Sequence, residues 1–402
     1  MKICFVVQRS GLEVNGGAEV LARQLAEQTA LLTDHTVEIA TTKAIDYVTW
    51  KNEYEKDEEE LNGVLIHRFP VVNERDQDKF NKFTAKMLEA GDNVEIQEEW
   101  MRLQGPETPA LIEWLSANKD NYDCFIFMTY LYYTTYYGLK AVGDKAIFIP
   151  TAHEEWPIHL KMFEEMFRLP KFYYYNTIEE KILVNDLFPW TKDYPDNNGT
   201  GGAGVEVPEN VSAEGFRSKF GIEGDFMIYV GRIDENKCCP ELFKYFREFK
   251  DRNKDSDLKL VLVGKEIIDV PKSDDIISLG FVSEEDKYNA IAASRFLVLP
   301  SHFESLSIVV LESMFLSHPV LVSGKCDVLR GHCRRSNAGL YYRDFYEFEG
   351  SVRFLLREKE ISQQMGRNGR DYVDENYSWK NIVARLDRIL KDHFGGNGND
   401  CF

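Results

Sequence analysis

The sequence lacks several features that would assign it to a common class of protein. Its 402 residues contain no stretch approaching the ~20 apolar residues that a membrane-spanning helix needs. The start, M-K-I-C-F-V-V, is too short for the apolar core of a signal peptide, so we expect no secretory signal. Positive charge is scarce, because 48 Lys and Arg residues stand against 67 Asp and Glu, a net charge of -19. This balance disfavours general nucleic-acid binding, which needs cations along the phosphates.

Paired cysteines are also missing. The seven cysteines are an odd number, and no two have the C-x-x-C spacing of common zinc and redox motifs. We therefore expect reduced thiols in a cytoplasmic protein, with peripheral membrane contact left open. The cysteines are Cys4, Cys124, Cys238, Cys239, Cys326, Cys333 and Cys401.

The sequence does contain an alternation of short apolar runs and helical patterns, which is typical of doubly wound α/β domains. A glycine- and asparagine-rich stretch, 191–203, interrupts the alternation and indicates a linker. We predict an N-terminal domain over 1–203, a C-terminal domain over 204–378, and a last helix with a frayed tail over 379–402. The acidic run 54–62 is expected to be an exposed loop. Predicted strands are 3–7, 37–40, 64–66, 124–128, 146–149, 226–230, 258–263, 276–279, 296–299, 320–322 and 340–342.

The first candidate site follows the first predicted strand, in G-L-E-V-N-G-G-A-E from Gly11 to Glu19. Glycines let a backbone approach a ligand closely, and the next helix offers free N–H groups and a positive dipole end. The spacing differs from the G-x-G-x-x-G of dinucleotide-binding proteins. An ordinary turn between strand and helix has similar glycines, so the motif alone leaves both interpretations open.

The second candidate is V-G-R at 230–232 with Lys237, where two cations follow the end of a predicted strand. Arg presents a planar fork and Lys a compact charge, and together they suit a diphosphate. Solvated surface cations are the common alternative, but ligands gather at the carboxyl ends of strands in open α/β sheets. The charge distribution agrees, because residues 1–200 carry a net -14 and residues 201–402 only -5.

The third and strongest candidate is S-H-F-E-S-L-S at 301–307, between a predicted strand and an apolar helix. Glu304 lies just after the carboxyl end of the predicted strand, and Glu312 lies eight residues later, inside the helix. Residues 305–308 would offer N–H groups at the helix start, where a phosphate binds favourably, and carboxylates accept hydrogen bonds from sugar hydroxyls. The alternative is that Glu304 caps the helix and Glu312 is solvated, but the neighbours of Glu312 are mostly apolar.

The fourth candidate is T-A-H-E at 151–154, which again follows a predicted strand and contains His153. A lone histidine is more often structural, and His159 has the wrong spacing to share one helical face with it, which disfavours a zinc site. Two D-x-D pairs, at 76–78 and 255–257, are better explained as solvated acids than as metal ligands.

One further stretch mixes bases with apolar residues and could touch a membrane surface. It is short and close to acids, so an ordinary amphipathic helix is the favoured interpretation. The residues are Lys79, Phe80, Lys82, Phe83, Lys86 and Met87.

Taken in order, these motifs resemble those of the retaining glycosyltransferases of family four, which have the GT-B fold. The resemblance is clearest over residues 226–390 and looser in the N-terminal half, where it rests on G-G-A-E at 16–19 and on His153. It implies an α/β fold with two Rossmann-like doubly wound domains facing across a cleft, and a C-terminal helix that crosses back to the first domain. The matching stretches are Y-V-G-R-I-D-E-N-K, L-V-L-V-G-K, G-F-V, S-H-F-E-S-L-S-I-V-V-L-E-S-M, P-V-L-V-S, A-G-L and Y-S-W.

The resemblance also implies roles for single residues, with His153 and Glu304 as the candidate catalytic pair. Glu154 stands where the family often has Asp, and L-S at 306–307 replaces a common Phe-Gly, which changes the sugar pocket. The implied site has Arg232, Lys237, Gly16 and Gly17 at the donor diphosphate, Glu304, Leu306, Ser307 and Ile308 at the donor sugar, and Glu312 and Val282 at the nucleoside.

The implied activity is transfer of a hexose-type sugar from a nucleotide donor, expected to be UDP-linked, with retention of configuration. The expected acceptor is a glycan or a lipid-linked molecule in polysaccharide biosynthesis. No metal or other cofactor is expected, because Arg232, Lys237 and the helix start would stabilise the departing diphosphate. A nucleotide-sugar epimerase on the same fold and a non-catalytic nucleotide-sugar sensor remain alternatives. A phosphorylase would normally be much longer and carry a cofactor-binding lysine.

Overall fold

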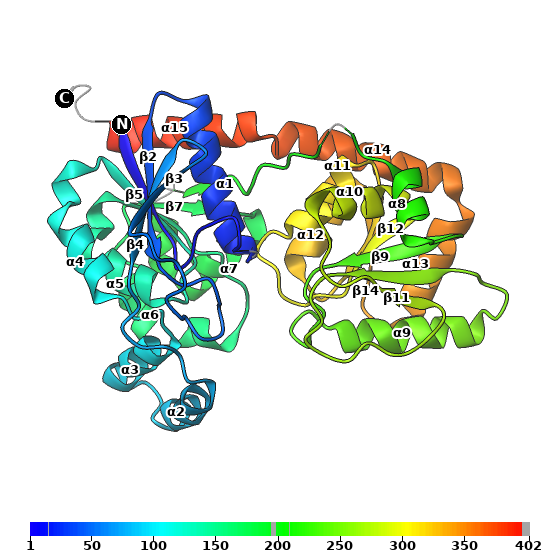
Figure 1. Cartoon of the computed structure of the whole chain (residues 1–402), viewed down its shortest axis with the longest axis horizontal. Helices are drawn as coiled ribbons and strands as arrows, with labels where there is room; N and C mark the ends of the chain where they lie inside the picture. Colours follow the sequence, from blue (N-terminus) through cyan, green and yellow to red (C-terminus); the bar gives the residue numbers. More distant parts are fainter. Residues whose placement is uncertain (15, 194–197, 209, 396–402) are drawn as a thin grey trace. The chain divides into compact units, whose positions relative to one another are not determined.

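The chain divides into two compact units (Figure 1). The first comprises residues 1–203 and 382–402, and the second comprises residues 204–381. The predicted frayed tail, Cys401 and part of the predicted linker lie outside the described residues. The computed structural model describes residues 1–14, 16–193, 198–208 and 210–395.

The first unit contains an eight-stranded sheet in the order β3-β4-β2-β1-β5-β6-β7-β8. Neighbouring strands are parallel except for the β3–β4 hairpin. Strands covered by helices on both faces need continuous apolar runs, as in the fully buried C-F-I-F-M of β5. The strands are β1 (Lys2–Val6), β2 (Thr36–Thr42), β3 (Glu58–Leu61), β4 (Val64–Phe69), β5 (Cys124–Met128), β6 (Ala146–Ile149), β7 (Phe172–Tyr175) and β8 (Asn198–Thr200).

The helices of the first unit follow the strands in the order expected of a doubly wound domain. The last helix, α15, begins at Trp379, and from Ile382 onward it belongs to this unit. There Asp387 bonds to His35, and the His393 carbonyl accepts from Lys171. The other helices are α1 (Gly17–Leu32), α2 (Gln77–Glu89), α3 (Val94–Gln104), α4 (Pro109–Ala117), α5 (Tyr133–Val142), α6 (Met162–Met166) and α7 (Ile178–Leu187), and α15 ends at Phe394.

The second unit contains a six-stranded parallel sheet in the order β11-β10-β9-β12-β13-β14. The first strand in sequence, β9, lies between β10 and β12, so the strand order reverses there, and ligands of such sheets bind at this point. The strands are β9 (Phe226–Val230), β10 (Lys259–Val263), β11 (Ile276–Ser278), β12 (Phe296–Leu299), β13 (Val320–Ser323) and β14 (Gly339–Tyr342). The helices are α8 (Ala213–Phe220), α9 (Cys239–Arg252), α10 (Glu284–Ala293), α11 (Ile308–Phe315), α12 (Asp327–Ser336), α13 (Phe345–Arg357) and α14 (Lys359–Asn376).

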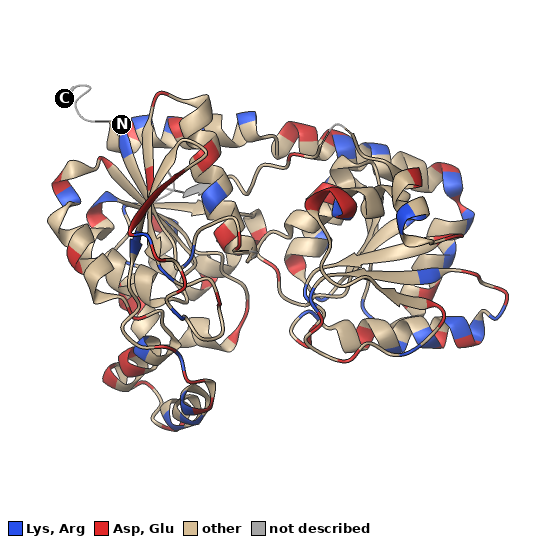
Figure 2. Ribbon diagram, in the orientation of Figure 1, with Lys and Arg blue, Asp and Glu red and all other residues tan. Residues whose placement is uncertain are grey.

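Two Rossmann-like α/β units therefore confirm the predicted fold class, but the prediction for the acidic run 54–62 is wrong in part. Residues 58–61 form β3, an edge strand that pairs with β4 across a turn at Asn62 and Gly63, both with positive φ. The ribbon of this strand has the colour of acidic residues in Figure 2, and charge on an edge strand disfavours pairing with other chains. Strand β7 was not predicted either.

The basic stretch at 79–87 lies in α2, which packs on α3 as an amphipathic helix. Thr84 accepts a hydrogen bond from Trp100 Nε1 at 2.9 Å, and Phe80 packs against the same ring. Among the residues that the structure describes, no helix is long and apolar enough to cross a bilayer. The six cysteines within these residues are all free thiols.

Candidate functional site

In the second unit, two glycines bring the ends of β9 and β10 together. Gly231 and Gly264 have φ values of 149° and 144°, which only glycine adopts readily. A Cβ on Gly264 would lie 1.9 Å from the Gly231 carbonyl oxygen. The two strand ends therefore touch through backbone, and the chain turns from β9 directly into the loop that carries the predicted cations.

Lys237 and Arg232 lie in this loop and both contact carboxylates. The Lys237 Nζ lies 2.7 Å from Glu304 Oε1, in the loop after the neighbouring strand β12. Arg232 lies 3.4 Å from Asp234, and 49% of its side chain is exposed. Asp234 also accepts from the Lys237 backbone N–H at 2.8 Å, which fixes the loop. The structure thus brings Lys237 and Glu304 into contact, and Arg232 lies in the same loop as Lys237.

Glu312 is buried in α11, which excludes the alternative that it is a solvated surface acid. Its Oε1 lies 2.9 Å from both the Lys287 ammonium and the Tyr288 hydroxyl, which extend from α10. Burial acts to lower the pKa of Lys287, but the Glu312 and Glu284 carboxylates outweigh it and raise that pKa. Burial also raises the pKa of Tyr288, and the Glu312 carboxylate adds to the effect. Glu312 therefore sits in a fixed polar cluster.

Helix α11 begins directly after the Glu304 loop, with Ile308 as its first residue and Ser307 as its N-cap. Ser307 has φ 67° and ψ 77°, a left-handed conformation unusual for a non-glycine residue, and its side chain makes no capping bond. The N–H groups of the first two helical positions, Ile308 and Val309, have no carbonyl partner within a helix, so they are suited to an anion. Glu304 does not cap this helix, because it pairs with Lys237.

The predicted base-contacting residue, Val282, is half-buried in the segment between β11 and α10. Gly280 just before it has φ 66°, and its carbonyl accepts from the Gly264 N–H at 2.8 Å. Val282 is thereby connected to the ends of β9 and β10, and it immediately precedes the helix that supplies Lys287.

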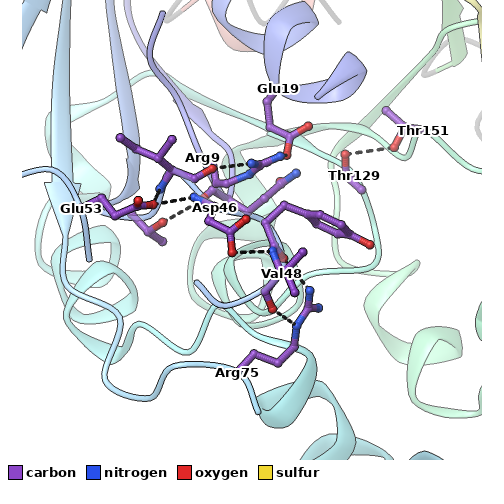
Figure 3. A network of polar contacts seen from close by, with 12 residues as sticks. Arg9, Glu19, Asp46, Val48, Glu53, Arg75, Thr129 and Thr151 are labelled. Carbon is purple, nitrogen blue, oxygen red and sulfur yellow. Dashed lines mark hydrogen bonds and ion pairs between the residues drawn. The ribbon is translucent and has the colours of Figure 1, made fainter. Parts of the chain in front are cut away.

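The first unit holds the remaining predicted residues. Helix α1 begins at Gly17, with Gly16 as its N-cap. A Cβ on Gly16 would lie 2.1 Å from Glu19 Oε2, whereas one on Gly17 would meet nothing within 4 Å. Glu19 is held by Arg9 at 2.6 Å, and this buried pair is seen in Figure 3. Packing therefore explains Gly16, and Gly17 is the glycine with open space beside its backbone. Asn15 of the same motif lies outside the described residues.

A polar network continues from Arg9 into the loop after β2. Arg9 Nη1 donates to the Ile45 carbonyl at 2.6 Å, and Asp46 accepts from the Thr49 backbone N–H at 2.7 Å (Figure 3). Arg75 donates to the Val48 carbonyl at 2.8 Å. These contacts connect the start of α1 to the loop after β2.

His153 follows β6 in a segment with unusual backbone. Thr151 and Thr129 have φ values of 50° and 71°, and their hydroxyls bond at 3.0 Å (Figure 3). The His153 side chain is 30% exposed, with Nδ1 3.6 Å from Glu155. Glu154 bonds to His159 at 2.6 Å instead. The two histidines thus have separate carboxylate partners.

Sequence reasoning missed Glu180, which fixes the segment that carries His153. Its carboxylate accepts from the Ala152 N–H at 2.7 Å and from the Asn176 N–H at 2.6 Å. Burial raises the pKa of this carboxyl to about 8. A capping pattern, Thr177 followed three residues later by Glu180, was the available signal. Lys287 was also missed, because its pairing with Glu312 spans distant parts of the sequence.

In the described part of the chain, no three His, Cys, Asp or Glu residues gather around one point. Asp76 caps α2 by accepting from the Lys79 N–H at 3.0 Å.

Known proteins match both the second unit and the fold. Residues 213–372 match the family model for glycosyl transferases group 1. An uncharacterized glycosyltransferase of Methanocaldococcus jannaschii is 24% identical over 233 residues, which cover 54% of this chain and 55% of that protein. The capsular polysaccharide biosynthesis glycosyltransferase CapM of Staphylococcus aureus is 22% identical over 243 residues, covering 54% and 61%. The matched part thus spans little more than half the length of these curated relatives.

Solved structures match over a larger share of the chain. HepE from Anabaena, in complex with UDP and glucose, has a TM-score of 0.67 at 13% identity, and the match covers 98% of this chain and 100% of that one. At this identity the likeness concerns the fold.

Proposed function

Because residues 213–372 form a glycosyltransferase group 1 domain on a GT-B fold, we propose that the chain is a retaining glycosyltransferase. It moves a hexose-type sugar from a nucleotide donor, UDP-linked in this proposal, to a glycan or lipid-linked acceptor. The bound UDP and glucose of HepE support the choice of donor, and the role of CapM in capsular polysaccharide supports the choice of acceptor.

The observation that carries this proposal is the Lys237–Glu304 pair directly before the N-terminus of α11. Three groups occur together at the carboxyl ends of the neighbouring strands β9 and β12. They are a cation that can bind a phosphate, a carboxylate that can accept from sugar hydroxyls, and a helix start that can bind the distal phosphate. Glu312 adds a buried acceptor for a ribose one helical segment further on. A nucleotide sugar contains each of the groups that these residues would bind.

In the proposed reaction, the bond between the sugar's anomeric carbon and the diphosphate oxygen breaks. The acceptor hydroxyl oxygen attacks from the same face, and its proton passes to the departing phosphate oxygen. Arg232, Lys237 and the start of α11 stabilise the negative charge that develops on the diphosphate, in place of a divalent cation. Leu306, Ser307 and Ile308 contribute backbone N–H groups at this point.

The first unit contributes two further residues to the proposal. Gly17 leaves space for a phosphate to approach the start of α1, where the positive dipole end favours an anion. The His153 side chain is 30% exposed and lies in a segment fixed by Glu180, which suits a residue that contacts the reacting sugar. The free thiols support a cytoplasmic location.

Incubation of the purified protein with a panel of UDP- and GDP-sugars tests this proposal. Slow release of the nucleoside diphosphate, unchanged by a chelator, is expected from one or a few donors. Loss of activity with the chelator and recovery with manganese would contradict the metal-free reaction. Conversion of the sugar while it remains attached would indicate an epimerase, and tight binding with no turnover would indicate a sensor.

A further inference from the structure

A histidine outside the predicted site contacts the loop that begins α11. His332 lies on α12 and is completely buried. Its Nε2 lies 2.9 Å from the Leu306 carbonyl oxygen, and its Nδ1 lies 3.2 Å from the Tyr372 hydroxyl on α14. Tyr372 is itself 3.3 Å from the Tyr377 hydroxyl. The imidazole therefore connects the Glu304–Ser307 loop to two helices of the second unit.

The partners of His332 determine where its proton lies. The Leu306 carbonyl only accepts hydrogen bonds, so Nε2 must carry the proton and donate. Burial lowers the pKa of His332 to about 4, so the ring is neutral near pH 7 and Nδ1 accepts from the Tyr372 hydroxyl. Each ring nitrogen then has a partner of the opposite kind, and the ring has one stable orientation.

The bond from His332 also determines the direction of a backbone N–H. In a trans peptide, the carbonyl and the next N–H point in opposite directions. Because the Leu306 carbonyl points toward the buried imidazole, the Ser307 N–H points away from it. Ser307 has the left-handed φ of 67°, and its own carbonyl accepts from the Val310 N–H at 3.1 Å. This unusual conformation is thus held from both sides.

We infer that His332 is a positioning residue for donor binding, which holds the Leu306–Ser307 peptide so that the Ser307 N–H faces the distal phosphate and sugar of the donor. This inference rests on the proposed function, because it assumes a nucleotide sugar at the start of α11. His332 itself does not contact the donor. Its effect is confined to the distal part of the ligand, since the nucleoside is assigned to Glu312 and Val282.

Two substitutions of His332 distinguish the roles of its two ring nitrogens. His332→Gln places an amide N–H near the position of Nε2, where it can donate to Leu306. His332→Asn places its amide near Nδ1, too short to reach that carbonyl. Tyr372→Phe keeps the imidazole and removes the donor to Nδ1. All three alter the same buried cluster, so general destabilisation affects them similarly and is followed by thermal unfolding.

The experiment compares the affinities of UMP and UDP by calorimetry for the full chain and the three variants. UMP lacks the distal phosphate, so every variant should bind it within about twofold of wild type. His332→Asn should bind UDP about 10- to 100-fold more weakly, as expected for losing a hydrogen bond to a charged group. The affinity of His332→Gln for UDP should stay within about threefold of wild type. Tyr372→Phe should lose less UDP affinity than His332→Asn and should keep its affinity for UMP.

The inference would be overturned if His332→Asn lost affinity for UMP and UDP equally, or if its affinity for UDP were unchanged. If His332→Asn does not fold, Tyr372→Phe decides by the same comparison of UMP with UDP. A wild-type protein that binds neither nucleotide would instead contradict the proposed function, so the two failures are distinguishable.

Discussion

The Lys237 ammonium lies 2.7 Å from the Glu304 carboxylate, which joins the loop after β9 to the loop after β12 by an ion pair. The two side chains are 29% and 12% exposed, so a ligand can reach the pair although it is sheltered from bulk water. Both partners were predicted separately from sequence as a phosphate-binding cation and a sugar-binding acid. Their contact places the two functions at one point of the second unit.

Replacement of Lys237 should reduce turnover more than it reduces stability. For Lys237→Met we expect kcat/KM for donor hydrolysis to fall about 10²- to 10³-fold, because one charge on the developing diphosphate is lost. Lys244→Met, at an exposed position of α9, serves as the matched control and should leave kinetics unchanged. Equal activity of Lys237→Met and wild type would show that the pair is structural.

Replacement of Glu312 should weaken nucleotide binding. Glu312→Gln keeps the shape but replaces the charged acceptor, so we expect the Kd for UMP and UDP to rise about 10-fold or more. Glu284→Gln is the control, because Glu284 also pairs with Lys287 at 2.7 Å but is 74% exposed. Calorimetric titration of both variants measures the difference. Unchanged affinity in Glu312→Gln would remove this residue from the ribose site.

Glu180 predicts a pH dependence of stability. Burial raises the pKa of its carboxyl from the usual 4.5 to about 8, so the folded protein retains a proton that the unfolded chain releases. Stability from this group is fully present below pH 4.5 and is lost as pH rises toward 8, by at most about 1.4 kcal/mol per pH unit. Glu180→Gln does not titrate. Urea unfolding between pH 5 and 8 measures the free energy of unfolding of both proteins. As pH rises, that of the wild type should fall relative to that of Glu180→Gln. Parallel pH profiles of the two proteins would contradict the raised pKa of Glu180.

The two adjacent glycines of α1 predict opposite outcomes. Gly16→Ala should reduce stability by about 1–3 kcal/mol, because the new methyl group would press on Glu19 in its buried pair with Arg9. Gly17→Ala has open space and should leave the melting temperature nearly unchanged. If the donor approaches Gly17, kcat/KM should nevertheless fall in that variant. A stable and fully active Gly17→Ala protein would remove this glycine from the donor site.

Local patterns were sufficient for much of the fold. The strand predicted at 226–230 has the observed bounds of β9, because a buried parallel strand needs a continuous apolar run. The edge strand at 58–61 was missed, because its acidic side chains lack that run and its pairing depends on a neighbouring strand. Strand β7, F-Y-Y-Y, is short and aromatic and has no alternating pattern.

The contact between predicted site residues was predictable where these residues follow parallel strands. Glu304 and Lys237 are of this kind, since parallel strands bring their carboxyl ends to one edge. The pairing of Glu312 with Lys287 and the bond from His332 to Leu306 depend on how α10, α11 and α12 pack. Nothing in the sequence spacing indicates either contact.

The central claim is sugar transfer with retention, and time-resolved proton NMR of donor hydrolysis tests it most directly. With a nucleotide donor whose sugar is α-linked, water serves as the acceptor, and the first free sugar is observed before its anomers equilibrate. We expect the α-anomer to accumulate first, together with free nucleoside diphosphate, and Lys237→Met to slow both signals. Initial accumulation of the β-anomer would contradict it.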